Sequence, residues 1–151
     1  MTGPEIVDSP TEWVADHIRR YVETGGIDGH IWRGVPTLLL TTVGRKTGIS
    51  RRTALIYGTD DEDFIIVASK GGHPHHPLWY ENLVIQPDVT LQVGARVIQA
   101  RASTIGDVNK YDRIWDQMVS IWPGFEDYKA QTSRIIPLVV LKPPDRKSTR
   151  L

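Results

Sequence analysis

From Val35 to Tyr57 the chain reads VPTLLLTTVGRKTGISRRTALIY, and this stretch predicts how the fold is organised. Two apolar runs, Val35–Leu40 and Thr53–Tyr57, flank a short polar segment that contains Gly44 and Gly48. Apolar runs of this length, rich in β-branched residues and separated by a glycine turn, are typical of adjacent strands. Because the connection is short, the two strands are expected to pair antiparallel.

The turn between these strands, Thr41–Arg52, is strongly basic. Arg45, Lys46, Arg51 and Arg52 place four cations within eight residues. Its glycines permit positive φ, so the backbone can present several N–H groups to one side. Such a turn suits a phosphate or a chain of carboxylates. A solvated hairpin turn with ordinary surface charge is an equally good interpretation.

Composition narrows the classes of function. The 151 residues are enough for one domain with a core. Lys plus Arg and Asp plus Glu each number 18, and this zero net charge argues against a general nucleic-acid or membrane-surface binder. The chain has no cysteine, which excludes disulfides and thiolate chemistry. No secretory signal or spanning run is recognised, so a cytoplasmic protein is expected.

An amphipathic helix is predicted near the N-terminus. Ser9 is expected to be its N-cap, with Pro10 in the first turn and Glu12 completing a capping box. Gly25-Gly26 ends the helix. Its apolar face is expected to pack on the domain, because its polar face carries both signs of charge. That face consists of Trp13, Val14, His17, Ile18, Tyr21 and Val22.

Six strands and three more helices are predicted along the rest of the chain. The strands are expected at Val35–Val43, Arg52–Gly58, Phe64–Ser69, Val89–Val93, Arg96–Ser103 and Ile135–Leu141. The helices are expected at Leu78–Ile85, from the Asp107 cap to Trp122, and at Phe125–Ser133. Pro137 suggests an edge position or a bend for the last strand.

Short connections between these strands favour an antiparallel arrangement. The fold class is therefore α+β and mostly β: a small six-stranded barrel with an N-terminal helix and peripheral helices. The expected organisation is an N-terminal helix and lead-in loop over residues 1–34, a barrel domain over 35–143 and a flexible tail over 144–151.

Three further stretches are candidate site segments. Ala68-Ser-Lys-Gly-Gly lies where a strand runs into a loop, and its small residues would let a flat ligand approach the backbone. Pro77-Leu-Trp-Tyr-Glu-Asn starts a helix, whose N-terminus attracts anions. Trp122, Phe125 and Tyr128 surround a Pro-Gly turn and could wall an apolar ligand. The alternatives are a flexible turn for the first and core packing for the other two.

A histidine cluster does not predict a metal site. His73, His75 and His76 fall within four residues, but Pro74 and Pro77 interrupt them. Three imidazoles in this spacing do not converge readily on one ion, and no Asp, Glu or Cys stands beside them at ligand spacing. An exposed polar loop is the preferred interpretation.

Four motifs taken together resemble the deazaflavin-dependent nitroreductase family of actinobacteria. They are TTVGRKTG from Thr41, ASKGG from Ala68, PLWYENL from Pro77 and RIIPLVVL from Arg134. The resemblance extends over roughly Val35 to Pro143. It implies a split β-barrel that binds coenzyme F420, whose tail is anionic. It also implies an enzyme that transfers hydride from the reduced coenzyme to a flat, electron-poor substrate such as a quinone, an enone or a nitroaromatic compound.

The resemblance also assigns roles to residues. Ser69 and Tyr128 are the candidates for orienting or protonating the substrate. The implied cofactor-binding set is Arg45, Lys46, Thr47, Arg51, Thr53, Ala54, Ala68, Ser69, Lys70, Pro77, Trp79 and Asn82. The implied substrate-binding set is Ile56, Trp122, Phe125 and Tyr128. Nitroimidazole-activating members of the family have tyrosines at the positions of Trp122 and Phe125, so quinones or enones are expected to fit better here.

Two other functions stay open on the sequence. The split-barrel architecture also hosts FMN and FAD, and a non-catalytic F420-binding protein is a further alternative. The expected partner is a small-molecule substrate and not a nucleic acid. We expect a monomer or homodimer in the cytoplasm, with at most peripheral association with the inner membrane face through the N-terminal helix.

Overall fold

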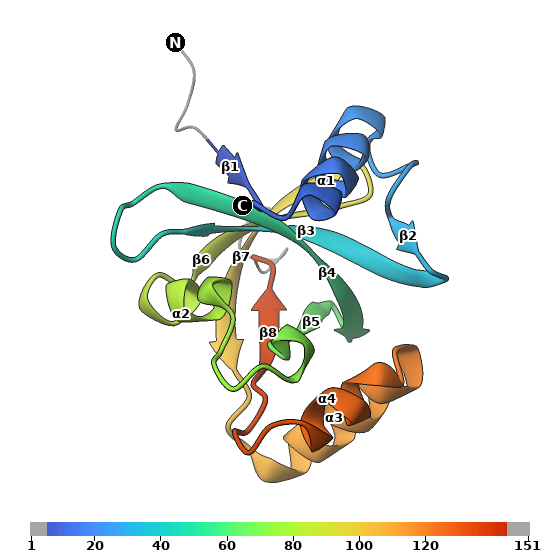
Figure 1. Ribbon diagram of the computed structural model, residues 1–151, viewed down its shortest axis with the longest axis vertical. Helices are drawn as coiled ribbons and strands as arrows, with labels where there is room; N and C mark the ends of the chain where they lie inside the picture. Colours follow the sequence, from blue (N-terminus) through green and yellow to red (C-terminus); the bar gives the residue numbers. More distant parts are fainter. Residues whose placement is uncertain (1–5, 145–151) are drawn as a thin grey trace.

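The computed structural model describes residues 6–144, so most of the expected tail at 144–151 lies outside the described residues. Figure 1 shows a sheet curled on itself with helices around it. The strands are β1 Ile6–Asp8, β2 Ile31–Trp32, β3 Val35–Val43, β4 Ser50–Asp60, β5 Asp63–Val67, β6 Asp88–Val93, β7 Arg96–Thr104 and β8 Leu138–Lys142. The helices are α1 Glu12–Thr24, α2 Leu78–Ile85, α3 Val108–Ile121, α4 Gly124–Ala130 and a short 3-10 helix η1, Lys70–Gly72.

The six predicted strands form a closed antiparallel barrel, which confirms the expected fold. The strand order is β1-β4-β5-β8-β7-β6-β3-β2, and a further pairing between β3 and β4 closes the ring. The stretch quoted at the start supplies that closing pair, in a register that joins Thr37 to Ile56 and Val43 to Ser50. Two extra strands lie outside the ring: β1 runs parallel to β4, and β2 pairs with β3.

Two local predictions were wrong, and one of the two alternatives given for Pro137 is excluded. Helix α1 begins at Glu12 with Thr11 as N-cap, and no side chain caps it; the Ser9 hydroxyl instead accepts a bond from the Thr11 amide. The lead-in loop expected between the N-terminal helix and Val35 contains β2. Pro137 does not mark an edge strand, because β8 lies between β5 and β7 and begins only at Leu138. Proline is tolerated at this position because it has no N–H to pair and only its carbonyl is used. That carbonyl accepts a hydrogen bond from the backbone amide of Ala68.

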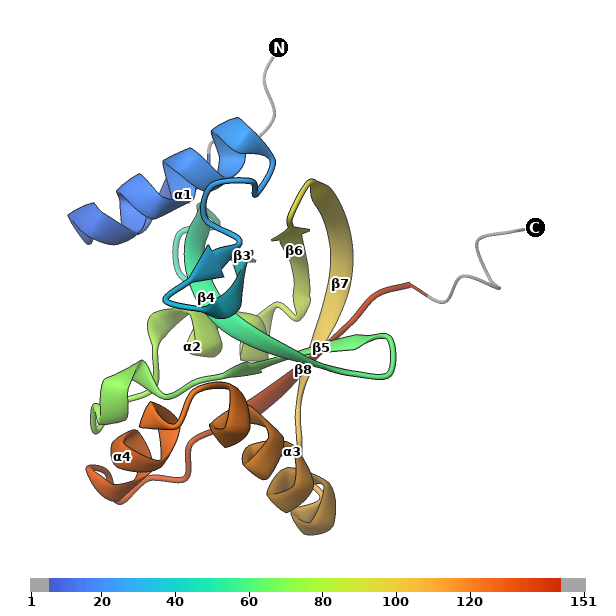
Figure 2. The ribbon, with the colours of Figure 1, turned by 90° about the vertical axis from the view of Figure 1, so that its right-hand side faces the viewer.

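Apolar side chains fill three places. The barrel interior is packed by residues such as Leu38, Leu40 and Leu91. A second cluster lies between the outer face of β5 and β8 and the helices α3 and α4. A third joins Ile18 and Tyr21 of α1 to β3. Figures 1 and 2 place α1 at one end of the molecule and α3–α4 at the other, with the barrel between them.

Helix α1 is held against the barrel by its buried face. The hydroxyl of Tyr21 donates to the carbonyl of Thr37 at 2.9 Å and accepts from the amide of Gly94 at 2.8 Å. Burial raises the pKa of Tyr21, so the hydroxyl keeps its proton. Trp13 at the other end of the helix is 60% exposed, so the apolar face predicted from periodicity is only partly buried.

Candidate active site

The barrel wall opens along one edge of β4. On that edge β1 pairs with β4 from Ser50 to Arg52, whereas β5 pairs with it only from Tyr57 onward. Between these pairings, and within the part of the chain that the structure describes, residues 53–56 have no strand partner on this edge. Their backbone N–H and C=O groups can therefore meet the edge of a bound molecule.

A cavity of about 910 Å³ lies at this opening, within the size range of small-molecule and cofactor sites. Its walls come from β4, the η1 loop, the start of α2, the turn between α3 and α4, and the N-terminal segment with α1. The predicted site residues that line it are Arg51, Thr53, Ala54, Ile56, Ser69, Lys70, Pro77, Trp79, Asn82, Trp122, Phe125 and Tyr128. Arg45, Lys46, Thr47 and Ala68 are not among its lining residues.

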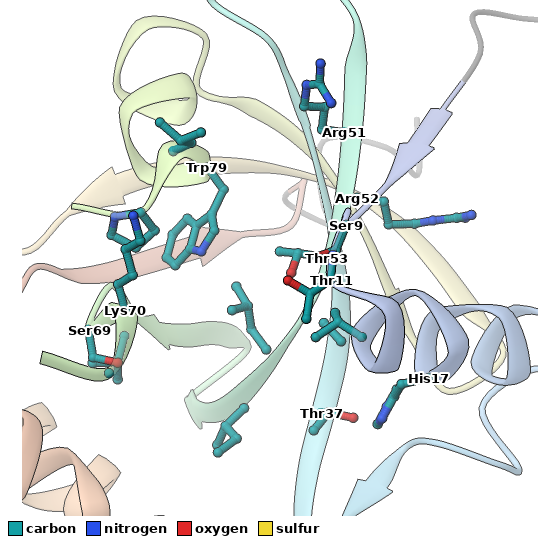
Figure 3. Close-up of a pocket in the computed structure, with 18 of the residues that line it drawn as sticks. Ser9, Thr11, His17, Thr37, Arg51, Arg52, Thr53, Ser69, Lys70 and Trp79 are labelled. Carbon is teal, nitrogen blue, oxygen red and sulfur yellow. Dashed lines mark hydrogen bonds between the residues drawn. The ribbon is translucent and has the colours of Figure 1, made fainter. Parts of the chain in front are cut away.

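The cavity reaches both faces of β4. Alternation places Thr53 with Leu55, which packs in the barrel interior, and Ala54 with Ile56 on the outer face. On that outer face Ala54 packs on the α1 cluster and Ile56 on the α3–α4 cluster. Figure 3 shows the same division, with Trp79 on one side of the β3–β4 pair and the N-terminal helix on the other. The open edge explains this reach, because no neighbouring strand separates the two faces there.

Two of the four cations of the basic turn already have partners. Arg45 donates to the amide oxygen of Asn82 from its backbone N at 3.2 Å and its Nη1 at 2.9 Å, and it lies 3.7 Å from Glu81. These bonds join the turn to α2. Arg52 forms two bonds with the carboxylate of Asp8, at 2.7 and 3.2 Å, which join β4 to β1.

Lys46 and Arg51 are the exposed cations of this turn. Neither forms an ion pair with any residue in 6–144, and Arg51 lines the cavity. The hydroxyl of Thr47 accepts a hydrogen bond from the backbone amide of Ile49 at 3.2 Å, which stabilises the turn. An anion at this end of the cavity would meet Arg51, whereas Lys46 is exposed on the turn outside the lining residues.

The loop after β5 presents polar groups to the cavity. Ser69 has right-handed helical angles, whereas Lys70 and Gly71 have φ of 46° and 61°. This succession turns neighbouring backbone N–H groups toward one point, a geometry that binds anionic or carbonyl oxygens. Ser69 is only 7% exposed and lines the cavity, and its hydroxyl has no hydrogen-bond partner among residues 6–144. Figure 3 shows Ser69 and Lys70 together at the cavity wall.

Arg134 fixes this loop. Its guanidinium donates to the carbonyls of Ala68, Ser69 and His73, at 3.1, 2.7 and 2.9 Å. A further contact of 3.1 Å joins it to Nδ1 of His76. Burial lowers the pKa of Arg134, which nonetheless stays charged. Sequence reasoning placed Arg134 in a motif but missed this role, because its partners are more than 55 residues away.

The aromatic wall is present and is shared with the core. Phe125 is 5% exposed and packs on Trp115, yet it also lines the cavity. The rings of Phe125 and Tyr128 stand edge to face, with centroids 6.1 Å apart. The indole N–H of Trp122 points to the Tyr128 hydroxyl at 3.4 Å. Core packing and a position in the cavity wall are therefore compatible for this segment.

Several lining residues were not predicted as site residues. One group comes from the N-terminal segment, α1 and β2: Val7 to Thr11, Trp13, Val14, His17 and Trp32. The others are Thr37, Thr42, Arg52, Leu55, Val67, Gly71 and Leu78. His17 is buried and hydrogen-bonds the carbonyl of Gly29 at 2.9 Å. No short-range signal marks the first group, because their approach to the cavity depends on how α1 docks on the barrel.

The described residues contain no group of three or more His, Cys, Asp or Glu side chains that could hold a metal ion. His73 and His75 lie side by side, with ring centroids 5.5 Å apart, whereas His76 contacts Tyr80 and Arg134.

A closed antiparallel barrel with a cavity at the open edge of β4 defines a split β-barrel. The chain belongs to the F420H(2)-dependent quinone reductase family, whose model matches residues 13–143. It is therefore an oxidoreductase, and its hydride donor is reduced coenzyme F420. This finding confirms the F420 resemblance and does not support the FMN/FAD or non-catalytic alternatives.

Individual relatives agree with the family. The chain is 41% identical over 129 residues to an F420H(2)-dependent quinone reductase of Mycobacterium tuberculosis, covering 83% of this chain and 86% of that protein. A solved F420-H2 dependent reductase, FDR-A, is 32% identical with a TM-score of 0.65 and covers 75% of this chain and 98% of its own. A structure described as a domain-swapped dimer is 34% identical with a TM-score of 0.68, covering 89% of this chain and all of that one.

Proposed function

We propose that this enzyme delivers hydride from reduced F420 to a quinone, or to another flat electron-poor acceptor such as an enone or nitroaromatic compound. The observation that carries this proposal is one continuous cavity that joins an exposed basic turn to an aromatic wall. F420 carries carbon at ring position 5 and supplies two-electron hydride chemistry when bound. The protein contributes binding, orientation and the exclusion of water.

The cofactor-binding residues we propose divide by chemistry. Lys46 and Arg51 would hold the anionic tail, while Arg45 and Thr47 keep the turn in shape through the bonds described above. The ring would lie along the open edge of β4 and against the Ser69–Gly71 amides. The remaining members of the proposed set, Thr53, Ala54, Ala68, Lys70, Pro77, Trp79 and Asn82, would form the surrounding wall.

The tail-binding proposal is tested by titrating oxidised F420 and following its fluorescence. Each lost charge-assisted contact is expected to cost about 2 kcal/mol, so Lys46→Ala and Arg51→Ala should each raise the Kd roughly 30-fold. Arg101→Ala is the matched control, because Arg101 is exposed on β7 and paired with Asp88. An unchanged Kd in both test variants would rule out this assignment.

The substrate would stack between the cofactor ring and a wall formed by Ile56 and the aromatic residues Trp122, Phe125 and Tyr128. Ser69 and Tyr128 have the hydroxyls that would orient or protonate the acceptor oxygen. Tyr128→Phe keeps the wall and removes one hydroxyl, so kcat with a naphthoquinone should fall by about 10² or more if that group donates the proton. The Kd for F420 should not change. A kcat equal to that of the wild type would remove Tyr128 from this role.

We further propose a homodimer, because one structural relative is described as a domain-swapped dimer. Light scattering on the purified chain tests this, and a monomeric mass at micromolar concentration would overturn it.

No helix within residues 6–144 has the length and apolar character needed to span a bilayer. A cytoplasmic location is proposed on the enzyme class, with peripheral membrane association through α1 as a separate question for vesicle co-sedimentation.

A further inference from the structure

Three tryptophans from distant parts of the chain line one side of the cavity. Trp13 lies in the first turn of α1, Trp32 ends β2 and Trp122 follows α3. The rings of Trp13 and Trp32 are stacked, with centroids 6.1 Å apart and planes 18° apart. The rings of Trp32 and Trp122 have centroids 5.5 Å apart and planes tilted by 39°. Trp32 thus joins the other two into one aromatic strip.

Core packing does not account for this strip. Ile18 and Tyr21 of α1 are fully buried, whereas Trp13 on the same helix is 60% exposed. Its exposed position beside a cavity leaves apolar surface in water that a ligand would cover. Trp32 lies in a two-residue strand, and the guanidinium of Arg33 stands 4.8 Å from its ring centroid. That cation–π contact holds the middle ring of the strip in place.

The strip continues the wall already assigned to the substrate. Trp122 belongs to both, and its indole N–H is directed at Tyr128. A single-ring acceptor held near Tyr128 would be covered by Trp122 alone. A fused two- or three-ring acceptor would extend along the strip onto Trp32 and then Trp13.

We infer that Trp13 and Trp32 are specificity-determining residues that favour fused-ring acceptors over single-ring ones. This inference rests on the proposed quinone reductase function and adds the N-terminal helix and β2 to its substrate site. Selectivity follows because each added ring buries more apolar area against a wall that is already formed.

The test compares benzoquinone, naphthoquinone and anthraquinone derivatives of equal charge as acceptors for Trp13→Ala, Trp32→Ala and the wild type. Each lost aromatic contact should raise the KM for the fused-ring quinones about 3- to 10-fold. The KM for the benzoquinone and the Kd for F420 should stay within about twofold of the wild type. Val22→Ala is the matched control, because Val22 lies on α1, is 40% exposed and does not line the cavity.

A binding measurement without turnover separates recognition from chemistry. Protein loaded with oxidised F420 cannot reduce a quinone, so calorimetric titration with the naphthoquinone measures affinity alone. Both variants should bind it more weakly than the wild type, and Trp13→Phe should retain most of the affinity. Circular dichroism excludes loss of the fold as the cause.

The inference would be overturned if Trp13→Ala and Trp32→Ala weakened the binding of single-ring and fused-ring quinones equally, or weakened neither. Failure of the proposed function looks different. In that case the wild type itself would not reduce any quinone with F420H2, whereas the inference fails only if a working enzyme shows no ring-size dependence on Trp13 and Trp32.

Discussion

Thr37 and Thr42 lie on the same strand and are 3% and 1% exposed, but their hydroxyls have different surroundings. Thr37 donates to the carbonyl of Gly29 at 2.7 Å. The hydroxyl of Thr42 has no partner among residues 6–144. A buried hydroxyl without a partner loses its hydration and gains nothing in return. The two positions therefore provide a matched comparison.

Valine replaces threonine with nearly the same shape and no hydroxyl. Thr37→Val should lower the free energy of unfolding by about 1–2 kcal/mol, because it removes a buried hydrogen bond. Thr42→Val should leave it unchanged or raise it by about 1 kcal/mol. Urea unfolding of the cofactor-free protein measures both. A larger loss for Thr42→Val than for Thr37→Val would show that the Thr42 hydroxyl has a partner in the folded protein.

His76 predicts a pH dependence of stability. Burial lowers its pKa from 6.5, and the neighbouring Arg134 lowers it further, while Glu81 acts in the opposite direction. The unfolded chain therefore takes up this proton at a higher pH than the folded one. The contribution of neutral His76 to the free energy of unfolding is fully present above about pH 6.5. It is lost as the pH falls through the lower pKa that His76 has in the folded protein.

His76→Asn keeps an acceptor for Arg134 and removes the titration. Unfolding midpoints measured between about pH 7 and 5 should fall less steeply for this variant than for the wild type. His75→Asn is the control, because that neighbouring side chain is exposed. Equal slopes for His76→Asn and the wild type would contradict the prediction.

The positions of individual side chains were predictable where the alternation of faces along a strand determines them. The predicted strand Arg52–Gly58 places Ile56 and Tyr57 on opposite faces by alternation, and Ile56 lines the cavity while Tyr57 is buried and bonded to His30. The engagement of Arg45 with Asn82 was not predictable, because it joins residues 37 positions apart. A count of cations therefore does not reveal which of them are already paired within the protein.

At the scale of elements, the η1 loop depends on Arg134, which is the only described side chain that binds the carbonyls of Ala68, Ser69 and His73. Arg134→Lys keeps the charge but cannot reach all three. The expected cost is about 1.5–3 kcal/mol of local stability, so the loop amides should exchange hydrogen roughly tenfold faster or more. Arg101→Lys is the control, since Arg101 pairs only with Asp88 at the surface. Unchanged exchange in the loop would contradict this role.

Elements with strong periodicity were predicted well, and short ones were missed. The bounds of β3 and α2 agree with the prediction, and the Asp107 side chain caps α3 through the amide of Lys110 at 2.8 Å. Strands β1 and β2 contain three and two residues, too few to show alternation. They form because free edges of β4 and β3 are available for pairing in the folded barrel. Those edges depend on the tertiary structure and not on the local sequence.

At the scale of the whole molecule, the order of elements predicted the barrel, but not that α1 would lie over its open side. That placement depends on a close approach of two backbones at the C-terminal end of the helix. A Cβ added to Gly26 would stand 2.5 Å from the Cα of Gly94. No pattern in the sequence pairs these two glycines.

Gly26→Ala should therefore separate α1 from the β6–β7 turn. Gly26 and Gly34 have nearly the same φ, 84° and 82°, but a Cβ at Gly34 meets nothing within 4 Å. Gly34→Ala thus measures backbone strain alone, about 1–2 kcal/mol, whereas Gly26→Ala adds a clash between backbones that cannot yield by rotating a side chain. The unfolding free energy should fall by at least about 1 kcal/mol more for Gly26→Ala than for Gly34→Ala. Because Trp13 moves with α1, only Gly26→Ala should also weaken naphthoquinone binding; equal effects of the two variants would show that helix docking does not depend on this contact.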